Sequence, residues 1–123
     1  AFDIVKIGAL LLAAPLQRIR PARLNMQLDL SSTLSRGVDP VQVLAIHGRR
    51  IHSLHLRDGL APATPGDYVD ALPLGQGQIR WQPLLAAARR AGVRRYIVEM
   101  VSRNPATDPF EALRISAQFL RSA

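Results

Sequence analysis

An alternation of β-type and helical segments is the feature that most constrains how this chain folds. Residues 24–30 alternate apolar and polar side chains, which is typical of a strand with one buried face. Residues 51–57 and 95–101 are further short segments rich in β-favouring side chains, and helical patterns lie between them. Strands separated by helices pair in parallel through right-handed crossovers. The sequence therefore predicts an α/β fold with about three parallel strands and flanking helices.

The predicted helices have recognisable start and stop signals. Asp39 and Asp108 each stand before a proline, which places a capping carboxylate ahead of the first helical position. Gly48 and Gly92 are predicted to end two helices, in the left-handed conformation that glycine adopts easily. Spacing of three and four residues predicts that the last helix buries Phe110, Leu113, Ala117 and Leu120.

Composition and charge exclude several kinds of protein. The chain has no cysteine, so disulfides and thiolate chemistry are excluded. Residues 5–16 are apolar apart from Lys6, and without a basic leader or a cleavage site they predict a buried helix rather than a signal peptide. No run is long enough to cross a membrane, so we expect a cytoplasmic protein with no membrane partner. The net charge of +7 comes from scattered arginine pairs, which favours a solvated surface over a nucleic-acid-binding patch.

Three ionisable residues share one situation in the predicted sheet. Asp29, His55 and Glu99 each lie near the C-terminal end of a predicted strand and interrupt an apolar stretch. Such groups are costly to bury unless they are paired or bound to a metal, and this end of a parallel sheet is where sites collect. Two carboxylates and an imidazole suit Mn²⁺, Mg²⁺, Co²⁺ or Zn²⁺. The alternative is that Glu99 pairs with an arginine and that His55 is a satisfied core histidine.

Other residues of the same region are weaker candidates. His52 is predicted to face away from His55, toward the helices, and His47 to lie at a helix end. The long loop over residues 58–78 follows the second strand, at the end of the sheet where function collects. Its Gly-Gln-Gly run at 75–77 fits a loop as well as a phosphate-binding backbone.

The chain resembles the C-terminal part of bacterial sugar phosphate isomerases/epimerases, which are xylose-isomerase-like TIM barrels. The resemblance is carried by the run from His55 to Asp58, by the glycines at 75 and 77 before a helix, and by the strand that ends at Glu99. It runs in order from residue 2 to residue 121. It implies that residues 1–123 form a single partial domain, the C-terminal portion of a (β/α)8 TIM barrel.

The resemblance also implies a set of roles. Asp29, His55 and Glu99 would be three of four ligands to a divalent metal, Mn²⁺ or a relative of it. Glu99 would also be catalytic, as one of two acid/base groups that move a proton beside the sugar carbonyl through an enediolate. Arg57 and Asp58, in the same run as His55, are the residues expected to bind the sugar or sugar phosphate substrate.

The fourth ligand would come from a preceding strand that this sequence does not contain. About three strands cannot close a barrel, so we expect a missing N-terminal barrel half or a partner chain. The chain alone is then expected to bind metal weakly and to show little activity. Two alternatives to the isomerase stay open: a metal-dependent phosphodiester hydrolase similar to AP endonucleases, and a non-catalytic sugar-binding remnant of a barrel.

Overall fold

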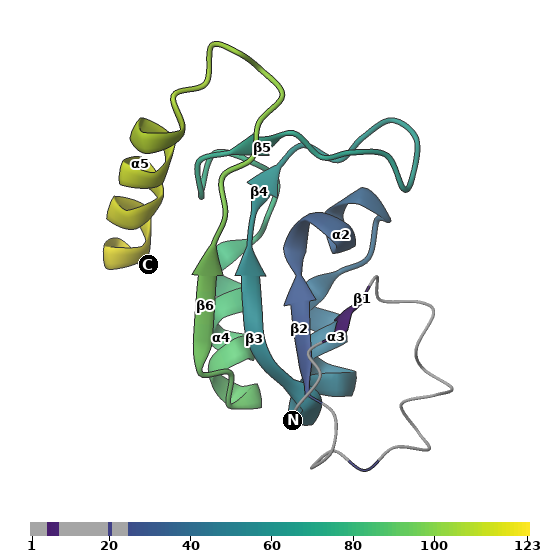
Figure 1. The fold of residues 1–123 in the computed structure, drawn as a ribbon. Coiled ribbons are helices and arrows are strands. Elements are labelled where there is room, and N and C mark those ends of the chain that lie inside the picture. Colours follow the sequence, from purple (N-terminus) through teal and green to yellow (C-terminus); the bar gives the residue numbers. More distant parts are fainter. Residues whose placement is uncertain (1–4, 8–19, 21–24) are drawn as a thin grey trace.

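The computed structural model describes residues 5–7, 20 and 25–123. Its main feature is a four-stranded parallel sheet in the order β1-β2-β3-β6 (Figure 1). The strands are β1 (Val5–Ile7), β2 (Met26–Asp29), β3 (Ile51–Leu56) and β6 (Arg95–Val98). The three strands expected from the sequence are β2, β3 and β6, and the α/β fold with parallel pairing is confirmed.

Several predicted ends differ from the structure. Strand β3 ends at Leu56 and β6 at Val98, one and three residues before the predicted ends at 57 and 101. Val5–Ile7 pair with β2 as a strand, so the helix predicted over 5–16 is wrong there, and its residues 8–16 lie outside the described chain. A short apolar run fits a buried strand as well as a buried helix, which explains this error. Strand β2 ends at Asp29, and Leu30 already belongs to helix α2 (Leu30–Ser35). The predicted strand over 24–30 is therefore one residue too long at this end.

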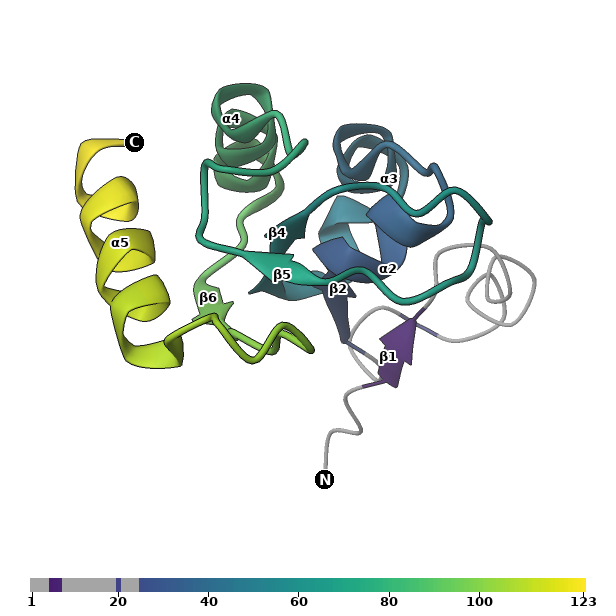
Figure 2. The same ribbon diagram turned by 90° about the horizontal axis from the view of Figure 1, so that it is seen from above.

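Two helices, α3 (Pro40–His47) and α4 (Trp81–Ala91), cover one face of the sheet (Figure 2). Their apolar side chains form the core together with the strand residues that point the same way. The largest fully buried apolar members are Leu28, Leu30, Leu54, Leu56 and Leu84. The alternate residues of β2 and β3 point to the other face, which carries the polar side chains considered below. None of the helices in the described part of the chain is long and apolar enough to cross a membrane.

The capping signals are mostly confirmed. The side chains of Asp39 and Asp108 accept hydrogen bonds from the second backbone amide beyond each of them, both at 2.9 Å. Gly92 ends α4 with φ 79°, as predicted. Gly48 was expected to be left-handed as well, but it has φ −53° and begins a short 3₁₀ helix (Gly48–Arg50). Glycine suits this position for another reason, because a Cβ there would lie 2.7 Å from the Cβ of Ala91.

Helix α5 (Pro109–Ser122) lies beside β6 and α4 at the edge of the sheet (Figure 2). The predicted buried face is wrong at Phe110 (82% exposed), Leu113 (38% exposed) and the exposed Ala117, whereas Leu120 packs against the core as predicted. The helix instead turns Ala112 and Ser116 inward. The Ser116 hydroxyl accepts a hydrogen bond from the amide of Leu74, and this contact helps to fix the rotation of the helix about its axis.

Candidate active site

Strand register brings the three predicted ligands to one edge of the sheet. Asp29 is the last residue of β2 and stands opposite His55 in β3, and His55 stands opposite Ile97 in β6. Glu99 follows two residues after Ile97, just beyond the strand. The side chains meet there: Asp29 Oδ2 lies 3.1 Å from His55 Nδ1, and His55 Nε2 lies 3.0 Å from Glu99 Oε2.

Asp29, His55 and Glu99 thus form a row of contacting side chains, and Asp29 is its fixed end. Its side chain accepts hydrogen bonds from the amides of Ser31 and Ser32 at the start of α2, and from the Ser31 hydroxyl at 2.7 Å. Burial raises the pKa of Asp29, but the Ser31 hydroxyl, the Ser32 amide and His55 outweigh it, so this pKa lies below its usual value. Asp29 is therefore an ionised carboxylate that both caps a helix and orients an imidazole.

Glu99 is the open end of the row. Its side chain is 40% exposed, whereas that of His55 is 5% exposed. Arg57 Nη1 lies 3.6 Å from the same Glu99 oxygen that contacts His55. The predicted alternative, an ion pair between Glu99 and an arginine, is thus present together with the histidine contact. An accessible carboxylate held by a buried imidazole and a guanidinium is placed to exchange a proton with a bound molecule.

Asp58, the other predicted substrate-binding residue, lies in a different environment. Its carboxylate is fully buried in the short antiparallel sheet of β4 (Asp58–Gly59) and β5 (Ala71–Leu72). It accepts five hydrogen bonds of 2.8–3.2 Å, from the amides of Gly59, Gly75, Gly77 and Ile79 and from the Trp81 indole. This arrangement favours an organising role for Asp58 in the 58–81 loop over the predicted contact with substrate.

The backbone of the same loop requires glycine at positions 75 and 77. Gly75 has φ 87°, a conformation that side chains other than glycine rarely adopt. A Cβ at Gly77 would collide with Asp58 Oδ1 and with the backbone of Gly59. Both glycines therefore let the backbone approach the Asp58 carboxylate, which the sequence pattern alone did not indicate.

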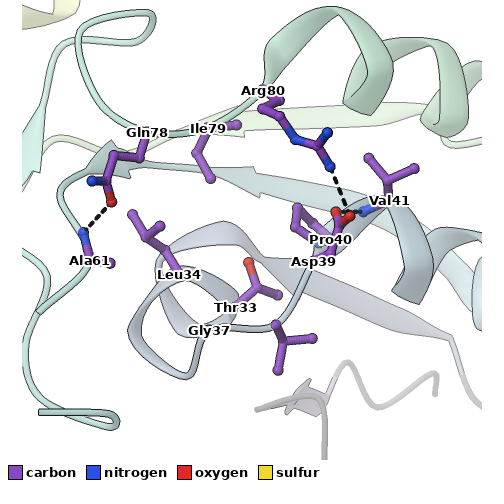
Figure 3. A pocket seen from close by; sticks show the side chains of 11 residues that line it. Thr33, Leu34, Gly37, Asp39, Pro40, Val41, Ala61, Gln78, Ile79 and Arg80 are labelled. Carbon is purple, nitrogen blue, oxygen red and sulfur yellow. Dashed lines mark hydrogen bonds and ion pairs between the residues drawn. The ribbon is translucent and has the colours of Figure 1, made fainter.

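A cavity of about 250 Å³ lies apart from this row, between the α2–α3 connection and residues 78–80 (Figure 3). Arg80 pairs with Asp39 at 2.9 Å on one side of it, and Gln78 accepts a hydrogen bond from the amide of Ala61 on the other. None of Asp29, His55, Arg57 and Glu99 lines it. We therefore place the candidate chemistry at the strand ends rather than in this cavity.

Comparison with known proteins gives matches among solved structures alone: no family model and no curated protein matches the chain significantly. A sugar phosphate isomerase/epimerase from Parabacteroides distasonis superposes with a TM-score of 0.71 and 22% identity, over 88% of this chain and 34% of that one. A xylose isomerase domain protein from Planctomyces limnophilus gives a TM-score of 0.72 and 18% identity, over 98% of this chain and 42% of that one. The chain has the fold of part of a xylose-isomerase-like TIM barrel.

This partial barrel spans only about a third of the length of the first matching structures, 34% in each case. A third match, the IOLI protein, was solved with a bound zinc atom and gives a TM-score of 0.63 and 21% identity over 84% of this chain. The expected fold class and the expected resemblance are therefore confirmed at the level of the fold.

The side chains at the strand ends are of types that bind divalent cations, but their present contacts leave no room for an ion among them. Two carboxylates and an imidazole are suitable ligands. However, each ring nitrogen of His55 already faces a carboxylate oxygen. Within residues 25–123, and in the few described residues before them, no group of three His, Cys, Asp or Glu side chains is arranged to hold an ion. Metal binding would therefore require His55 to exchange at least one carboxylate contact for the ion.

Proposed function

We propose that this chain forms part of a divalent-metal-dependent isomerase or epimerase that acts on a sugar or sugar phosphate. The observation that carries the proposal is the row Asp29–His55–Glu99, in contact at the C-terminal ends of three adjacent parallel strands. The likeness in fold to sugar phosphate isomerases/epimerases supports it. Active sites of TIM barrels lie at this end of the strands.

In this proposal Asp29, His55 and Glu99 hold the metal, which is Mn²⁺ or alternatively Mg²⁺, Co²⁺ or Zn²⁺. The zinc atom of the IOLI protein supports a divalent ion of this kind. When bound, the ion polarises the carbonyl and hydroxyl oxygens of the sugar and stabilises the negative charge that develops on them.

Glu99 is the proposed proton carrier, because its carboxylate is the most accessible group of the row. It takes the proton from the carbon beside the carbonyl, and the electron pair of that C–H bond moves toward the carbonyl oxygen to give an enediolate. Return of that proton by Glu99 to the former carbonyl carbon, with transfer of the hydroxyl proton to the other oxygen, isomerises the sugar. Epimerisation requires a second acid, supplied by the completed barrel, that protonates the opposite face of the same carbon. Arg57 and the buried His55 hold Glu99 in place for this transfer.

We also propose that residues 1–123 act as one part of a closed barrel, completed by an N-terminal half or a partner chain. Strand β6 supports this, since Tyr96 is 39% exposed and Ile97 is 44% exposed on an outer strand of the sheet. Open strand edges with apolar side chains are a liability that proteins cover. A completed barrel would cover this edge and supply a fourth ligand.

Metal titration tests the ligand set directly. We expect isothermal titration of Mn²⁺ or Zn²⁺ into the chain to show one weak site, because the described residues supply only the three proposed ligands. His55→Ala should abolish that site, whereas His52→Ala, a change at the exposed second residue of the same strand, should leave it unchanged. Equal binding by the two variants, or an unmodified chain that binds no ion, would argue against the proposal.

Proton exchange tests the reaction. We expect a longer polypeptide that contains this chain and a preceding barrel half to incorporate solvent deuterium beside the carbonyl of a sugar or sugar phosphate. Glu99→Gln should slow this exchange by about 10²–10⁴-fold, the usual contribution of a general base. Exchange that survives Glu99→Gln would remove Glu99 from the proposed role.

A further inference from the structure

Arg57 has hydrogen-bonding capacity that the described chain does not use. Its side chain is only 13% exposed, and its Nη1 lies 3.6 Å from Glu99. Its Nε and Nη2 atoms are buried and have no hydrogen-bond partner in the part of the chain that the structure describes. Unpaired donors on a buried guanidinium are costly, so they indicate a binding partner that is acceptor-rich.

A small cavity of about 170 Å³ is lined in part by Arg57. It lies between α2 and residues 66–69, and its polar lining includes Ser31, Ser32, Arg36, Arg57 and Tyr68. Among the described residues, the Ser32 hydroxyl makes no hydrogen bond and the exposed Arg36 makes no ion pair. Asp67 also lines the cavity and is the one acidic residue that does so.

The wall of the cavity opposite α2 is held in place by hydrogen bonds. The Tyr68 hydroxyl donates to the carbonyl oxygen of Val101 at 3.0 Å, and Asp70 accepts a 2.7 Å hydrogen bond from the amide of Arg103. The Tyr68 ring lies 5.9 Å from the Arg57 guanidinium carbon and 3.9 Å from that of Arg103. Two arginines, Arg36 and Arg57, line the cavity against the single aspartate Asp67, so the charge of its lining favours an anion.

We infer that this cavity binds the anionic group of the substrate, a phosphate or a carboxylate, with Arg57 as its central ligand and Arg36 at its mouth. A guanidinium presents paired donors that match the oxygens of both groups. The inference rests on the proposed function and deepens it. Because Arg57 contacts Glu99 as well as the cavity, an anion held there places the carbon chain attached to it beside the Glu99 carboxylate.

The size of the cavity agrees with a group rather than a whole sugar. Pockets that enclose a complete small molecule usually measure about 300–1,000 Å³. A volume of about 170 Å³ accepts a phosphate or carboxylate and leaves the sugar carbons outside, toward the strand ends. The substrate class that follows is an anionic sugar, such as a sugar phosphate or a sugar acid, rather than a neutral one.

Binding of simple anions to the chain tests the site without any turnover. We expect inorganic phosphate or acetate to shift the NMR signal of the Arg57 Nε–H in a saturable way. The anion that binds more tightly indicates whether the substrate carries a phosphate or a carboxylate. The affinity should fall at least tenfold in Arg57→Gln and severalfold in Arg36→Gln. Arg121→Gln, an exposed change at the end of α5, is the matched control and should bind like the unmodified chain.

Arg57→Lys separates a binding defect from a folding defect, because it keeps the charge and loses the paired donors. We expect it to remain folded by circular dichroism and to bind the anion several times more weakly. Unchanged anion affinity in Arg57→Gln and Arg57→Lys would overturn the inference. Anion binding by a chain whose completed barrel exchanges no deuterium would uphold the anion site and refute the proposed isomerase. Equal exchange of neutral and anionic sugars would refute the anion site and leave the isomerase standing.

Discussion

Replacing Asp58 by asparagine is expected to destabilise the chain more than any other single-atom change in the loop. Asp58 Oδ2 accepts three of the five hydrogen bonds and Oδ1 accepts two. An asparagine oxygen can replace one of these atoms, and its NH₂ group then faces donors. If the oxygen takes the place of Oδ2, the amides of Gly59 and Ile79 lose their acceptor.

The magnitude follows from that count. Hydrogen bonds to a charged group contribute about 1.5–3 kcal/mol each, so losing two corresponds to about 3–6 kcal/mol. Because the loop can shift and admit water, we expect the free energy of unfolding to fall by about 3 kcal/mol, near the lower end of that range. This is a large share of the roughly 5–15 kcal/mol that stabilises a typical domain.

Urea unfolding measures this effect, with fluorescence and circular dichroism as two probes. Trp81 is the one tryptophan of the chain, and its indole donates to Asp58, so its emission reports the affected contact. The urea midpoint should fall by about 1–3 M at the usual denaturant sensitivity of small proteins. Asp67→Asn is the control, since its exposed side chain makes no hydrogen bond within the described residues. If Asp58→Asn lowers the free energy of unfolding by less than about 1 kcal/mol, the organising role is refuted and the original prediction that Asp58 binds substrate is favoured.

Two further predictions concern stability. Because folding lowers the pKa of Asp29, its stabilising contribution is present above the ordinary aspartate value of about 4 and is lost as the pH falls through the lower folded value. Urea midpoints measured down to about pH 3 should therefore decline more steeply for the unmodified chain than for Asp29→Asn, and parallel curves would contradict this. Gly92→Ala places a residue with a side chain in the left-handed conformation, at φ 79°. This should lower the free energy of unfolding by about 1–2 kcal/mol. A change within about 0.5 kcal/mol in urea unfolding would show that the C-cap tolerates alanine.

The sequence predicted the parts of the fold and site that depend on local patterns. Alternating side chains marked β2, and the position of Asp29, His55 and Glu99 at strand ends predicted that their side chains converge, as they do. This worked because parallel strands in register align their C-terminal ends. The role of these residues in metal binding stays a prediction, since strand position fixes proximity and leaves the direction of each ligand atom open.

The errors and omissions arise where distant segments decide the outcome. The inward face of α5 depends on the hydrogen bond from the Leu74 amide to the Ser116 hydroxyl, which joins residues 42 positions apart in the chain. Helical spacing alone could not distinguish that face from the more apolar one. Asp58 likewise finds its donors as far as Trp81, 23 positions on. The path of the loop determines these contacts, and no local pattern in the sequence indicated them.

Asp29 belongs at once to a strand, a helix cap and the candidate site, and this has a consequence for genetics. A mutational scan scored only by activity would assign the whole loss at this position to chemistry, although part of it would come from a helix that no longer starts correctly. Scoring the abundance of each variant alongside its activity would separate the two. Substitutions of Asp29 should then reduce both scores. Substitutions of the accessible Glu99 should reduce activity while the protein accumulates normally.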